Sequence, residues 1–436
     1  MGNPRDPSAT PQDDVENMSK FIINGGNKLN GAWRVQGMKN AATPILAATL
    51  LTRERCTIHN IPRISDLNHM LAILKDLGAE VSWLSEHTLQ IQTKKIIKNE
   101  MDYLLTKRMR SSVLCLGPLL AATGYVRMPE PGGCNIGNRP LNTHIFALQA
   151  LGAEVECEAQ YYNISGAKLQ GKEISLPEKS VTATENLLMA ASITPGTTII
   201  KNAAAEPHVA CLVRFLRQMG ADISGAGTHE IKVKGVSELQ GAEFSVIPDQ
   251  LEVGTIAILA ALSGGEITIS PVVSKDMAVI AAKLKEAGVD FIEQGESWLV
   301  RGSPGGLRPF QIETAPYPGF PTDLQAPFGV LATQAQGESL IRDPLYENRL
   351  GYMEELKKMG ARAIVVDPHA ARVIGPTPLT GQTIHSLDLR AGATLIIAAL
   401  IAQGQSVIEE AEIIDRGYEA IDARLRALGA DIRRVE

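Results

Sequence analysis

Residues 129–139 surround one cysteine with residue types that can make a thiol reactive. The segment reads Pro-Glu-Pro-Gly-Gly-Cys-Asn-Ile-Gly-Asn-Arg, a composition typical of a mobile, exposed loop with its own geometry. Glycines beside Cys134 let the backbone approach a ligand closely, and the charge of Arg139 favours the thiolate. The pattern fits a catalytic cysteine and an incidental surface cysteine about equally well.

A lysine and an asparagine stand where a helix is expected to begin. Lys39 and Asn40 directly precede an apolar helical run. A lysine at a helix N-terminus opposes the helix dipole, so a bound anion is the better reason for its presence. The alternative for Lys39 is an exposed side chain that extends from the first turn.

Five arginines occupy comparable loop or helix-start positions. A guanidinium group holds a carboxylate or a phosphate with two parallel hydrogen bonds. Each arginine alone fits a surface salt bridge better, but the set predicts an anion site between two domains. They are Arg110, Arg139, Arg349, Arg390 and Arg416.

One carboxylate ends a stretch that is stiffened by proline. Residues 315–323 contain three prolines and finish at Asp323, just before another helical run. Asp323 fits an N-cap of that helix and equally fits a positioned general base. The sequence leaves both interpretations open.

The elements that position these residues follow from a phrase that recurs six times. Each copy resembles Leu-Gly-Ala-Glu-Val, and successive glycines are 68 to 74 residues apart. So constant a period indicates a duplicated folding unit. The glycines are Gly78, Gly152, Gly220, Gly288, Gly360 and Gly429.

Each unit is predicted to contain two kinds of helix. In one unit a strand at 198–200 precedes an amphipathic helix at 208–219, which Gly220 ends. Before each such strand lies an alanine-rich run that is apolar nearly all round, which predicts a helix buried on every side. These buried helices are expected at 42–51, 112–122, 186–192, 255–263 and 393–402. Three units in each half predict two similar α/β domains, with a hinge near Asp249.

The composition narrows the class of protein. The chain has 436 residues, enough for two domains, and it is 44% hydrophobic but only 4% aromatic, which predicts an aliphatic core. A net charge of −6 without a basic run argues against a nucleic-acid partner. We find no signal peptide, membrane span or metal-ligand spacing, and we expect residues 1–17 to be disordered.

The cysteines favour a reducing compartment. They are odd in number and lack metal-ligand spacing. Cys56, Cys115, Cys157 and Cys211 lie in apolar stretches and are expected to be reduced core residues. We therefore expect a cytoplasmic protein without a metal or cofactor.

Six motifs, in order along the chain, resemble those of the UDP-N-acetylglucosamine 1-carboxyvinyltransferase family of enolpyruvyl transferases. The resemblance runs from about Phe21 to the C-terminus. It implies an α/β fold like that of EPSP synthase, with two inside-out barrels of three βαβαββ-type units each. The first barrel would span 39–248, and the second 18–38 with 249–436. The motifs are Lys39-Asn40-Ala41-Ala42, Pro131-Gly132-Gly133-Cys134, Arg139-Pro140, Phe320-Pro321-Thr322-Asp323, Glu347-Asn348-Arg349 and Asp415-Arg416-Gly417-Tyr418.

The resemblance implies transfer of the enolpyruvyl group of phosphoenolpyruvate to the 3-hydroxyl of UDP-N-acetylglucosamine, with release of phosphate. This reaction opens peptidoglycan synthesis and proceeds by addition and elimination, without a metal. Cys134 would protonate carbon or assist phosphate departure, and it would be alkylated by the epoxide fosfomycin. Asp323 would take the proton of the sugar hydroxyl. The partners would be these two small molecules, and the protein would be a monomer or a weak homo-oligomer.

The resemblance also assigns residues to substrate binding. Asn40 and Asp323 would contact the sugar, and Lys39 and Arg416 would also contribute to catalysis. Phosphoenolpyruvate would be held by Lys39, Arg139 and Arg416, assisted by Arg110, Arg349 and Arg390. The other substrate contacts would be Asn142, His144, Lys179, Ser180, Thr182 and Tyr346.

Two departures from the family pattern define the alternatives. Asn142 stands where many members have aspartate, and residues 179–182 differ from a common glycine-bearing version. Both fit a paralogue that acts on another nucleotide sugar or hydroxyl acceptor. A ligand-binding relative without activity is a further alternative, but it would not need both an acid at Cys134 and a base at Asp323. Relatives that use shikimate lack the cysteine loop, which therefore favours the amino-sugar branch.

Overall fold

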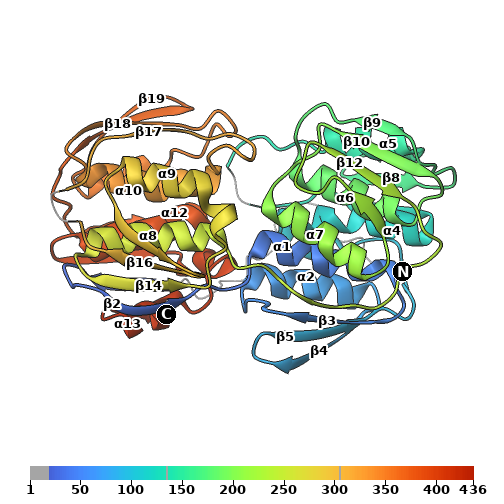
Figure 1. Ribbon diagram of the computed structural model, residues 1–436, viewed down its shortest axis with the longest axis horizontal. Coiled ribbons are helices and arrows are strands. Elements are labelled where there is room, and N and C mark those ends of the chain that lie inside the picture. The colour runs from blue at the N-terminus through green and yellow to red at the C-terminus, as the bar shows by residue number, and fades with distance from the viewer. Residues whose placement is uncertain (1–18, 134–135, 304–305) are drawn as a thin grey trace, which may run out of the picture.

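The chain forms two lobes in a computed structural model that describes residues 19–133, 136–303 and 306–436 (Figure 1). In each lobe, helices fill the interior and sheets lie outside them (Figure 1). Residues 1–17, predicted to be disordered, lie outside the described residues, as does Cys134. The longest described helix has 14 residues, and no helix in these ranges is long and apolar enough to cross a bilayer.

Three sheets, which belong to the first lobe, take their strands from residues 55–245 (Figure 1). In the four-stranded sheets one outer strand is parallel to its neighbour, and the other pairs are antiparallel. In the three-stranded sheet, a single parallel bridge from Glu100 to Arg127 marks the place of that outer strand. The strands, in sheet order, are β13 (Glu243–Ser245), β3 (Arg55–His59), β5 (Thr88–Gln92) and β4 (Glu80–Ser85); β9 (Glu173–Ser175), β10 (Thr197–Lys201), β12 (Glu230–Lys234) and β11 (Asp222–Ser224); and β6 (Tyr125–Pro129), β8 (Tyr161–Ser165) and β7 (Glu154–Glu158).

The other three sheets belong to the second lobe and combine residues 20–34 with residues 266–435 (Figure 1). Strand β1 lies between the two last strands of the chain and is antiparallel to both. These strands, in sheet order, are β2 (Asn30–Arg34), β14 (Glu266–Ser270), β16 (Ser297–Arg301) and β15 (Asp290–Gln294); β17 (Gln311–Glu313), β18 (Gly337–Arg342), β20 (Ala370–Gly375) and β19 (Arg362–Asp367); and β21 (Thr383–His385), β22 (Gln405–Glu409), β1 (Lys20–Asn24) and β23 (Asp431–Val435).

The predicted repeat is present in the structure. Residues 173–234 run β9, α6, β10, α7, β11, β12, which is the expected βαβαββ order. All six repeat glycines have a positive φ, between 82° and 116°, the left-handed conformation that glycine adopts most easily. The glycines therefore end six comparable helices, as the spacing predicted.

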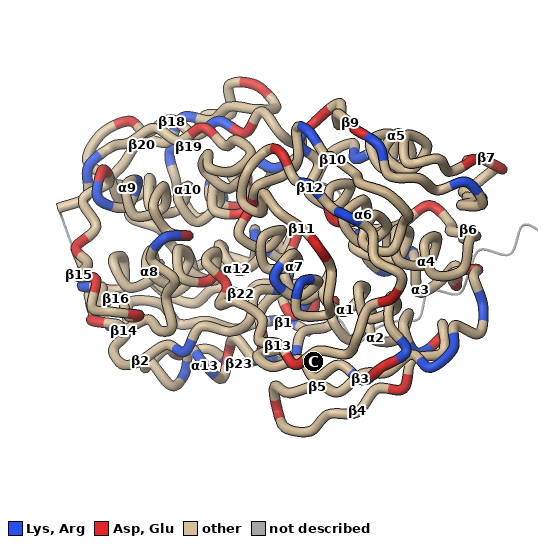
Figure 2. Tube along the Cα trace, turned by 45° about the vertical axis from the view of Figure 1, so that its right-hand side comes forward, with Lys and Arg blue, Asp and Glu red and all other residues tan. Residues whose placement is uncertain are grey.

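Six inner helices are buried along most of their length. Because they carry few charges, the tubes of α8, α10 and α12 are tan almost throughout, whereas charge gathers on outer strands and loops (Figure 2). Several begin earlier than predicted, because their first turns carry polar residues that do not fit the apolar period. They are α1 (Lys39–Ala48), α4 (Leu116–Thr123), α6 (Val181–Ser192), α8 (Gln250–Ser263), α10 (Gln325–Gln334) and α12 (Leu389–Ile401).

The remaining helices are half-exposed or short. The predicted amphipathic helix is α7, which begins at Pro207 and buries Val209, Leu212 and Leu216. The outer helices are α2 (Ser65–Asp76), α3 (Tyr103–Arg108), α5 (Asn142–Leu151), α7 (Pro207–Gln218), α9 (Ala278–Glu286), α11 (Tyr352–Lys358) and α13 (Ile421–Ala427). The 3-10 turns are η1 (Thr49–Leu51), η2 (Arg110–Cys115), η3 (Ser274–Met277), η4 (Thr322–Leu324) and η5 (Ala411–Arg416).

Two neighbouring chain segments connect the lobes. Gly37 and Pro248 form an antiparallel bridge, the N–H of Met38 donates to the carbonyl of Ile247, and the N–H of Asp249 donates to the carbonyl of Gln36. Both crossings therefore lie side by side at the predicted hinge. The residue bounds of the two domains stay a prediction.

One expectation about the core is wrong. Cys56, Cys115 and Cys211 are buried, but Cys157 is exposed. Cys157 lies in β7, the last strand of the three-stranded sheet, and most of that strand is exposed. Cys157 stands between Glu156 and Glu158 and alternates with Val155, a pattern that predicts one buried face, but this edge strand leaves the position of Cys157 exposed.

Candidate functional site

The predicted general base lies in a charged cluster of the second lobe. Asp323 is in the turn η4, just before the buried helix α10. Its Oδ1 accepts a hydrogen bond from Arg349 Nη2 at 2.7 Å, and its Oδ2 is 3.4 Å from Arg390 Nε. The side chains of Arg349 and Arg390 are only 9% and 4% exposed. Two buried cations thus hold this carboxylate.

The contacts of Asp323 exclude one of the two interpretations of its role, and the role as general base stays a prediction. Neither η4 nor α10 has a side-chain cap, so the interpretation as an N-cap is wrong. Burial alone would raise the pKa of Asp323, but the charges of Arg349 and Arg390, with a smaller effect of Lys39, hold that pKa well below its usual range. Asp323 is therefore ionised, and in this arrangement it is a weak base.

Arg390 is fixed from several sides. Its Nη1 donates to the hydroxyl of Tyr418 at 3.2 Å, and its Nη2 lies 3.7 Å from Asp249 Oδ2. Burial would lower the pKa of Arg390, but Tyr418, Asp249 and Asp323 raise it. Asp249 also caps α8 by accepting the N–H of Leu251. The hinge residue thus connects the start of α8 to this cluster.

A second cluster joins the lobes through one buried carboxylate. Asp66, near the start of α2, is 3% exposed. Its Oδ2 lies 2.9 Å from Nζ of Lys39, and its Oδ1 accepts a hydrogen bond from Nε of Arg416 at 2.9 Å. Burial would raise the pKa of Asp66, but the charges and hydrogen bonds of Lys39 and Arg416 lower it. Lys39 belongs to the first lobe and Arg416 to the second, so this contact forms only where the lobes meet.

Sequence reasoning missed Asp66. It follows the strand β3 of its unit and leads into the next helix, the place that Arg349 and Arg416 take in their own units. A search of unit-equivalent positions for charge of either sign could have found it.

A third cluster lies in the first lobe. Arg110 begins η2, and its Nη2 donates to the backbone carbonyl of Arg139. Burial, and then the charge of Arg139, lower the pKa of Arg110 to about 10. Two predicted cations therefore lie side by side, an arrangement that a bound anion would stabilise.

A buried histidine extends this third cluster. Nε2 of His144, in α5, lies 2.8 Å from the hydroxyl of Thr182 in the first turn of α6. Burial, and then the charge of Arg110, lower the pKa of His144 to about 3. His144 is therefore neutral near pH 7, and two residues that were each predicted to contact substrate, His144 and Thr182, lie together.

Tyr346 connects the clusters across the boundary between the lobes. The centre of its ring is 5.5 Å from the guanidinium carbon of Arg349. Burial raises the pKa of Tyr346, the charge of Asp323 adds to this, and Arg349 and Arg139 oppose it. Because Arg139 belongs to the first lobe, its charge reaches the second-lobe cluster.

The described parts of residues 129–139 contact the second lobe. The N–H of Asn138 donates to Glu347 Oε1 at 2.8 Å, and the N–H of Asn348 donates to the carbonyl of Ile136 at 3.2 Å. Gly133 has a φ of 124°, and a Cβ there would lie 2.8 Å from Cβ of Arg110. Glycine is thus required where this segment packs on Arg110.

Full exposure of this segment, as predicted, is wrong. Pro129, Pro131 and Ile136 are buried, whereas Gly133 and Asn138 are exposed. Removal of the proline rings and the isoleucine side chain from water is favourable, so buried and exposed residues alternate along the segment. Its mobility, and the catalytic role of Cys134, stay predictions.

The other predicted contacts divide between structural and exposed positions. Ser180 caps α6 by accepting the N–H of Ala183 at 3.4 Å, and Asn40 is half-buried in the first turn of α1. Asn142, the first residue of α5, and Lys179 are exposed. The structure does not bring Asn142 or Lys179 into the buried clusters.

Three buried donors of the second-lobe cluster make ion pairs at most, and no hydrogen bond within the described residues. Among the described residues, no acceptor lies in hydrogen-bond geometry for Arg349 Nε or for Arg390 Nε and Nη2. Buried guanidinium groups normally satisfy such donors. Donors of this kind suit an anion with several oxygen atoms.

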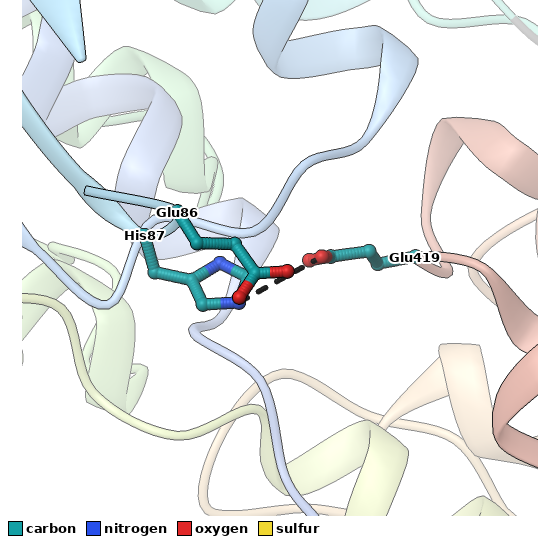
Figure 3. A group of neighbouring side chains, drawn as sticks. All are labelled: Glu86, His87 and Glu419. Atoms are coloured by element: carbon teal, nitrogen blue, oxygen red, sulfur yellow. Dashed lines mark ion pairs between the residues drawn. The ribbon is translucent and has the colours of Figure 1, made fainter.

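One group of described residues could hold a metal ion. Glu86, His87 and Glu419 offer three ligand atoms within 4.8 Å of one another (Figure 3). This group does not include a residue of the three charged clusters, although Glu419 follows Arg416 closely in sequence.

Known proteins are similar in sequence to this chain over nearly its whole length. The family described as EPSP synthase (3-phosphoshikimate 1-carboxyvinyltransferase) matches residues 23–425. UDP-N-acetylglucosamine 1-carboxyvinyltransferase 1 of Carboxydothermus hydrogenoformans is 45% identical over 418 residues, which cover 96% of this chain and 99% of that protein. UDP-N-acetylglucosamine 1-carboxyvinyltransferase of Clostridium botulinum is 45% identical over 419 residues, 96% of this chain and 100% of that protein.

Solved structures agree with the predicted fold. The enolpyruvyl transferase NikO from Streptomyces tendae has a TM-score of 0.88 at 26% identity, covering 96% of this chain and 99% of that chain. EPSP synthase from Acinetobacter baumannii has a TM-score of 0.75 at 19% identity, covering 96% and 100%, and supports the fold alone. The predicted fold class and family are confirmed: the chain belongs to the enolpyruvyl transferases of the EPSP synthase family, together with the UDP-N-acetylglucosamine 1-carboxyvinyltransferases.

Proposed function

We propose that this protein transfers the enolpyruvyl group of phosphoenolpyruvate to the 3-hydroxyl of UDP-N-acetylglucosamine and releases phosphate. The observation that carries the proposal is the meeting of Lys39, Asp66 and Arg416 across the lobes, beside Asp323 with its two arginines. Cations from both lobes suit a small substrate with a phosphate and a carboxylate. The acceptor is proposed from relatives that carry this activity in their names.

The reaction consists of an addition and an elimination. The sugar oxygen bonds to C2 of phosphoenolpyruvate while a proton is delivered to C3, which gives a tetrahedral intermediate. The C2–O bond to phosphate then breaks and C3 loses a proton, which restores the double bond. The products are an enolpyruvyl ether and inorganic phosphate. Lys39, Arg139 and Arg416 bind the phosphoenolpyruvate and stabilise the charge that develops on the departing phosphate.

Asp323 requires a change of partner before it can act as the base. Its lowered pKa makes it a poor acceptor while Arg349 and Arg390 neutralise it. An anionic substrate competes for these two guanidinium groups, which frees the carboxylate and raises its pKa. The sugar hydroxyl can then replace Arg349 as the hydrogen-bond donor to Asp323. Substrate binding thus activates the base.

The acid of the reaction is proposed to be Cys134. The described residues beside it, Gly133 and Ile136, contact Arg110 and the second lobe. The segment therefore joins the two halves of the site. Approach of the lobes positions an acid from the first lobe against a base from the second.

A second candidate is an enolpyruvyl transfer to another acceptor. NikO, at 26% identity, is an enolpyruvyl transferase whose name does not include UDP-N-acetylglucosamine. Asn142 and Lys179 are exposed in regions that the resemblance assigns to the nucleotide. These positions would distinguish the two acceptors, and the chemistry of Asp323 would be the same for both.

Phosphate release tests the proposed reaction. Purified protein is incubated with phosphoenolpyruvate alone, with UDP-N-acetylglucosamine, and with UDP or N-acetylglucosamine as incomplete acceptors. We expect rapid release only with UDP-N-acetylglucosamine, together with an enolpyruvyl product detected by mass spectrometry. Release with none of these acceptors would contradict the assignment, and faster release with another hydroxyl compound would favour the second candidate.

Fosfomycin labelling tests the role of Cys134, and Cys157 provides an internal control because its thiol is exposed. Fosfomycin should alkylate Cys134 alone, and faster in the presence of UDP-N-acetylglucosamine, because its phosphonate resembles phosphate. Cys134→Ala should lose turnover but keep sugar-nucleotide binding. Cys134→Asp should keep part of the activity, since a carboxylic acid can donate a proton, but resist fosfomycin. Equal labelling of Cys157, or full activity of Cys134→Ala, would contradict the role.

We further propose that the protein acts in the cytoplasm, as a monomer or a weak homo-oligomer, in peptidoglycan synthesis and thus in cell shape and division. The small anionic substrates and the absence of a spanning helix among the described residues support this setting. Light scattering coupled to size-exclusion chromatography would measure the oligomeric state.

A further inference from the structure

A histidine and two glutamates from opposite lobes converge beside the hinge. Glu86 and His87 form the turn between β4 and β5, and Glu419 lies between η5 and α13 (Figure 3). Nε2 of His87 is 3.9 Å from Glu86 Oε2 and 3.8 Å from Glu419 Oε1. The three atoms thus face one another, although Glu419 is far from the others in sequence.

The imidazole is oriented by a contact outside this group. Nδ1 of His87 lies 3.1 Å from the backbone carbonyl of Ile61. A carbonyl only accepts hydrogen bonds, so Nδ1 carries the proton. In the neutral ring, Nε2 then directs a lone pair at two carboxylates, which is unfavourable without a cation or a proton between them. A histidine held through Nδ1 in this way is typical of metal ligands.

Glu419 is held in the same manner. One of its oxygens, Oε2, accepts the backbone N–H of Arg63 at 2.8 Å, which leaves Oε1 directed at His87. The side chains of His87 and Glu419 are only 18% and 13% exposed, whereas that of Glu86 is 80% exposed. Two candidate ligands are therefore fixed and half-buried, and the third can move towards them.

We propose that Glu86, His87 and Glu419 bind a divalent cation of the zinc class. One imidazole nitrogen and two carboxylate oxygens are ligands that zinc accepts, and water would complete the coordination. Ligand atoms around one zinc ion lie about 3.3 Å apart. The separations of His87 Nε2 from the two carboxylate oxygens, 3.9 and 3.8 Å, exceed this by about half an ångström, and all three atoms lie within 4.8 Å of one another. Rotation of the exposed Glu86 side chain and a small shift of Glu419 can close these distances.

The surroundings provide access. Glu86 and His87 line an open cleft of about 580 Å³ whose walls also include Val35 and Pro248, one from each chain crossing. A hydrated ion can therefore reach the site from solvent. Because its ligands come from both lobes, a bound ion favours the arrangement in which Arg416 reaches Asp66.

The sequence predicted no metal site because it offered no ligand spacing. Here the ligands are two adjacent residues and a third that only the folding of both lobes brings near. Spacing along one helix or loop could not reveal such a group.

Direct binding of Zn²⁺ and Co²⁺ tests the proposal without using enzyme activity. The full chain is treated with a chelator and then iodoacetamide, so that exposed thiols such as Cys157 cannot bind metal. Isothermal titration with Zn²⁺ should show one site with a Kd below about 100 μM. Co²⁺ should produce visible absorption bands of a low-coordinate site, which Zn²⁺ abolishes. X-ray scattering should show a more compact particle after Zn²⁺ is added.

Variants separate this site from adventitious binding. His87→Ala and Glu419→Gln should each weaken Zn²⁺ binding at least tenfold and abolish the compaction, with circular dichroism confirming that each is folded. The matched control is His59→Ala, because His59 lines the same cleft but pairs with Glu243. Unchanged affinity in both His87→Ala and Glu419→Gln, equal loss in His59→Ala, or no wild-type site tighter than about 100 μM would overturn the proposal.

Discussion

Two carboxylates of this protein are each held by two cations, but in different ways. Asp323 contacts Arg349 and Arg390, and all three belong to the second lobe. Asp66 contacts Lys39 of its own lobe and Arg416 of the other. The first cluster can exist whether the lobes are near or apart, whereas the second depends on their approach. The Asp323 cluster therefore sets the charge of the site, and the Asp66 cluster depends on the approach of the lobes.

Lys39 connects the two clusters. Its Nζ lies 2.9 Å from Asp66 Oδ2, and its charge also lowers the pKa of Asp323. When an anionic substrate binds Lys39, both carboxylates should respond. The comparison between the clusters therefore separates the chemical step from the approach of the lobes, and each side can be changed independently.

The largest effect is expected from Asp323→Asn, which removes the charge from the second-lobe cluster. The side chain keeps nearly the same shape but cannot take a proton. We expect turnover to fall on the order of a hundredfold or more, with UDP-N-acetylglucosamine binding within about tenfold of wild type. Steady-state kinetics and calorimetry measure the two quantities. The control is Asp222→Asn, at an exposed position of β11. Near-normal turnover of Asp323→Asn would show that Asp323 is not the base.

A smaller loss is expected from Asp66→Asn, which weakens the contact between the lobes. A neutral amide cannot balance Lys39 and Arg416, so the approach of the lobes should become less favourable. We expect kcat/KM to fall about tenfold, and X-ray scattering should show less compaction with UDP-N-acetylglucosamine.

The matched control for Asp66→Asn is Asp76→Asn. Asp76 lies at the other end of α2 and pairs on the surface with Lys98 Nζ at 2.7 Å. An exposed pair contributes little, so this variant should retain wild-type kinetics. If Asp66→Asn compacts as wild type does, the cluster does not govern closure.

A pH effect of intermediate size tests the first-lobe cluster. The pKa of His144 is lowered to about 3, below the ordinary value of about 6.5. Between these values the unfolded chain binds a proton that the folded protein does not, so stability falls as pH decreases from about 6.5 and the loss is complete near pH 3. From pH 6.5 to pH 5 this removes up to about 2 kcal/mol.

The variant His144→Gln should reduce that dependence, since glutamine does not titrate. Urea unfolding at several pH values, followed by circular dichroism, measures the difference between variant and wild type. The same measurement on His59→Gln, at a half-exposed histidine, is the control. Equal slopes for wild type and His144→Gln would show that His144 is not the group responsible.

The smallest effect is expected from Glu347→Gln at the contact between the loop and the second lobe. Glu347 Oε1 accepts the N–H of Asn138 at 2.8 Å in an exposed position. An amide oxygen can replace the acceptor, so we expect fosfomycin to inactivate the variant no more than about threefold more slowly. A change as large as that of Asp66→Asn would mean that this contact, too, controls closure.

The parts of the fold that could be predicted depend on local rules. The six glycines, the order of elements in each unit and the buried helices follow from conformational preference and apolar periodicity. The first turns of the inner helices extended beyond the predictions, because residues such as Lys39 and Arg390 break the apolar period. Those polar first turns carry candidate site residues, so the apolar period breaks at the positions that the proposed function uses.

The parts of the site that could not be predicted depend on contacts between distant segments. Asp66 has no local feature that marks it, and its importance appears only when Arg416 lies beside it. The ion-pair partners of Asp323 are Arg349 and Arg390, both far away in sequence, and its role as the base stays a prediction. Cys157 was assigned to the core because it lies in a strand-like stretch, but an edge strand leaves it exposed.

The position of β1 has a consequence for synthesis on the ribosome. β1 lies between β22 and β23, so the sheet that contains the first described strand needs the last ones. Every strand of the first-lobe sheets has been made once Ser245 is translated, whereas the N-terminal strand must wait for Asp431–Val435. Nascent chains therefore carry an unpaired strand edge through most of translation, and a premature stop before β23 would leave that edge open to aggregation.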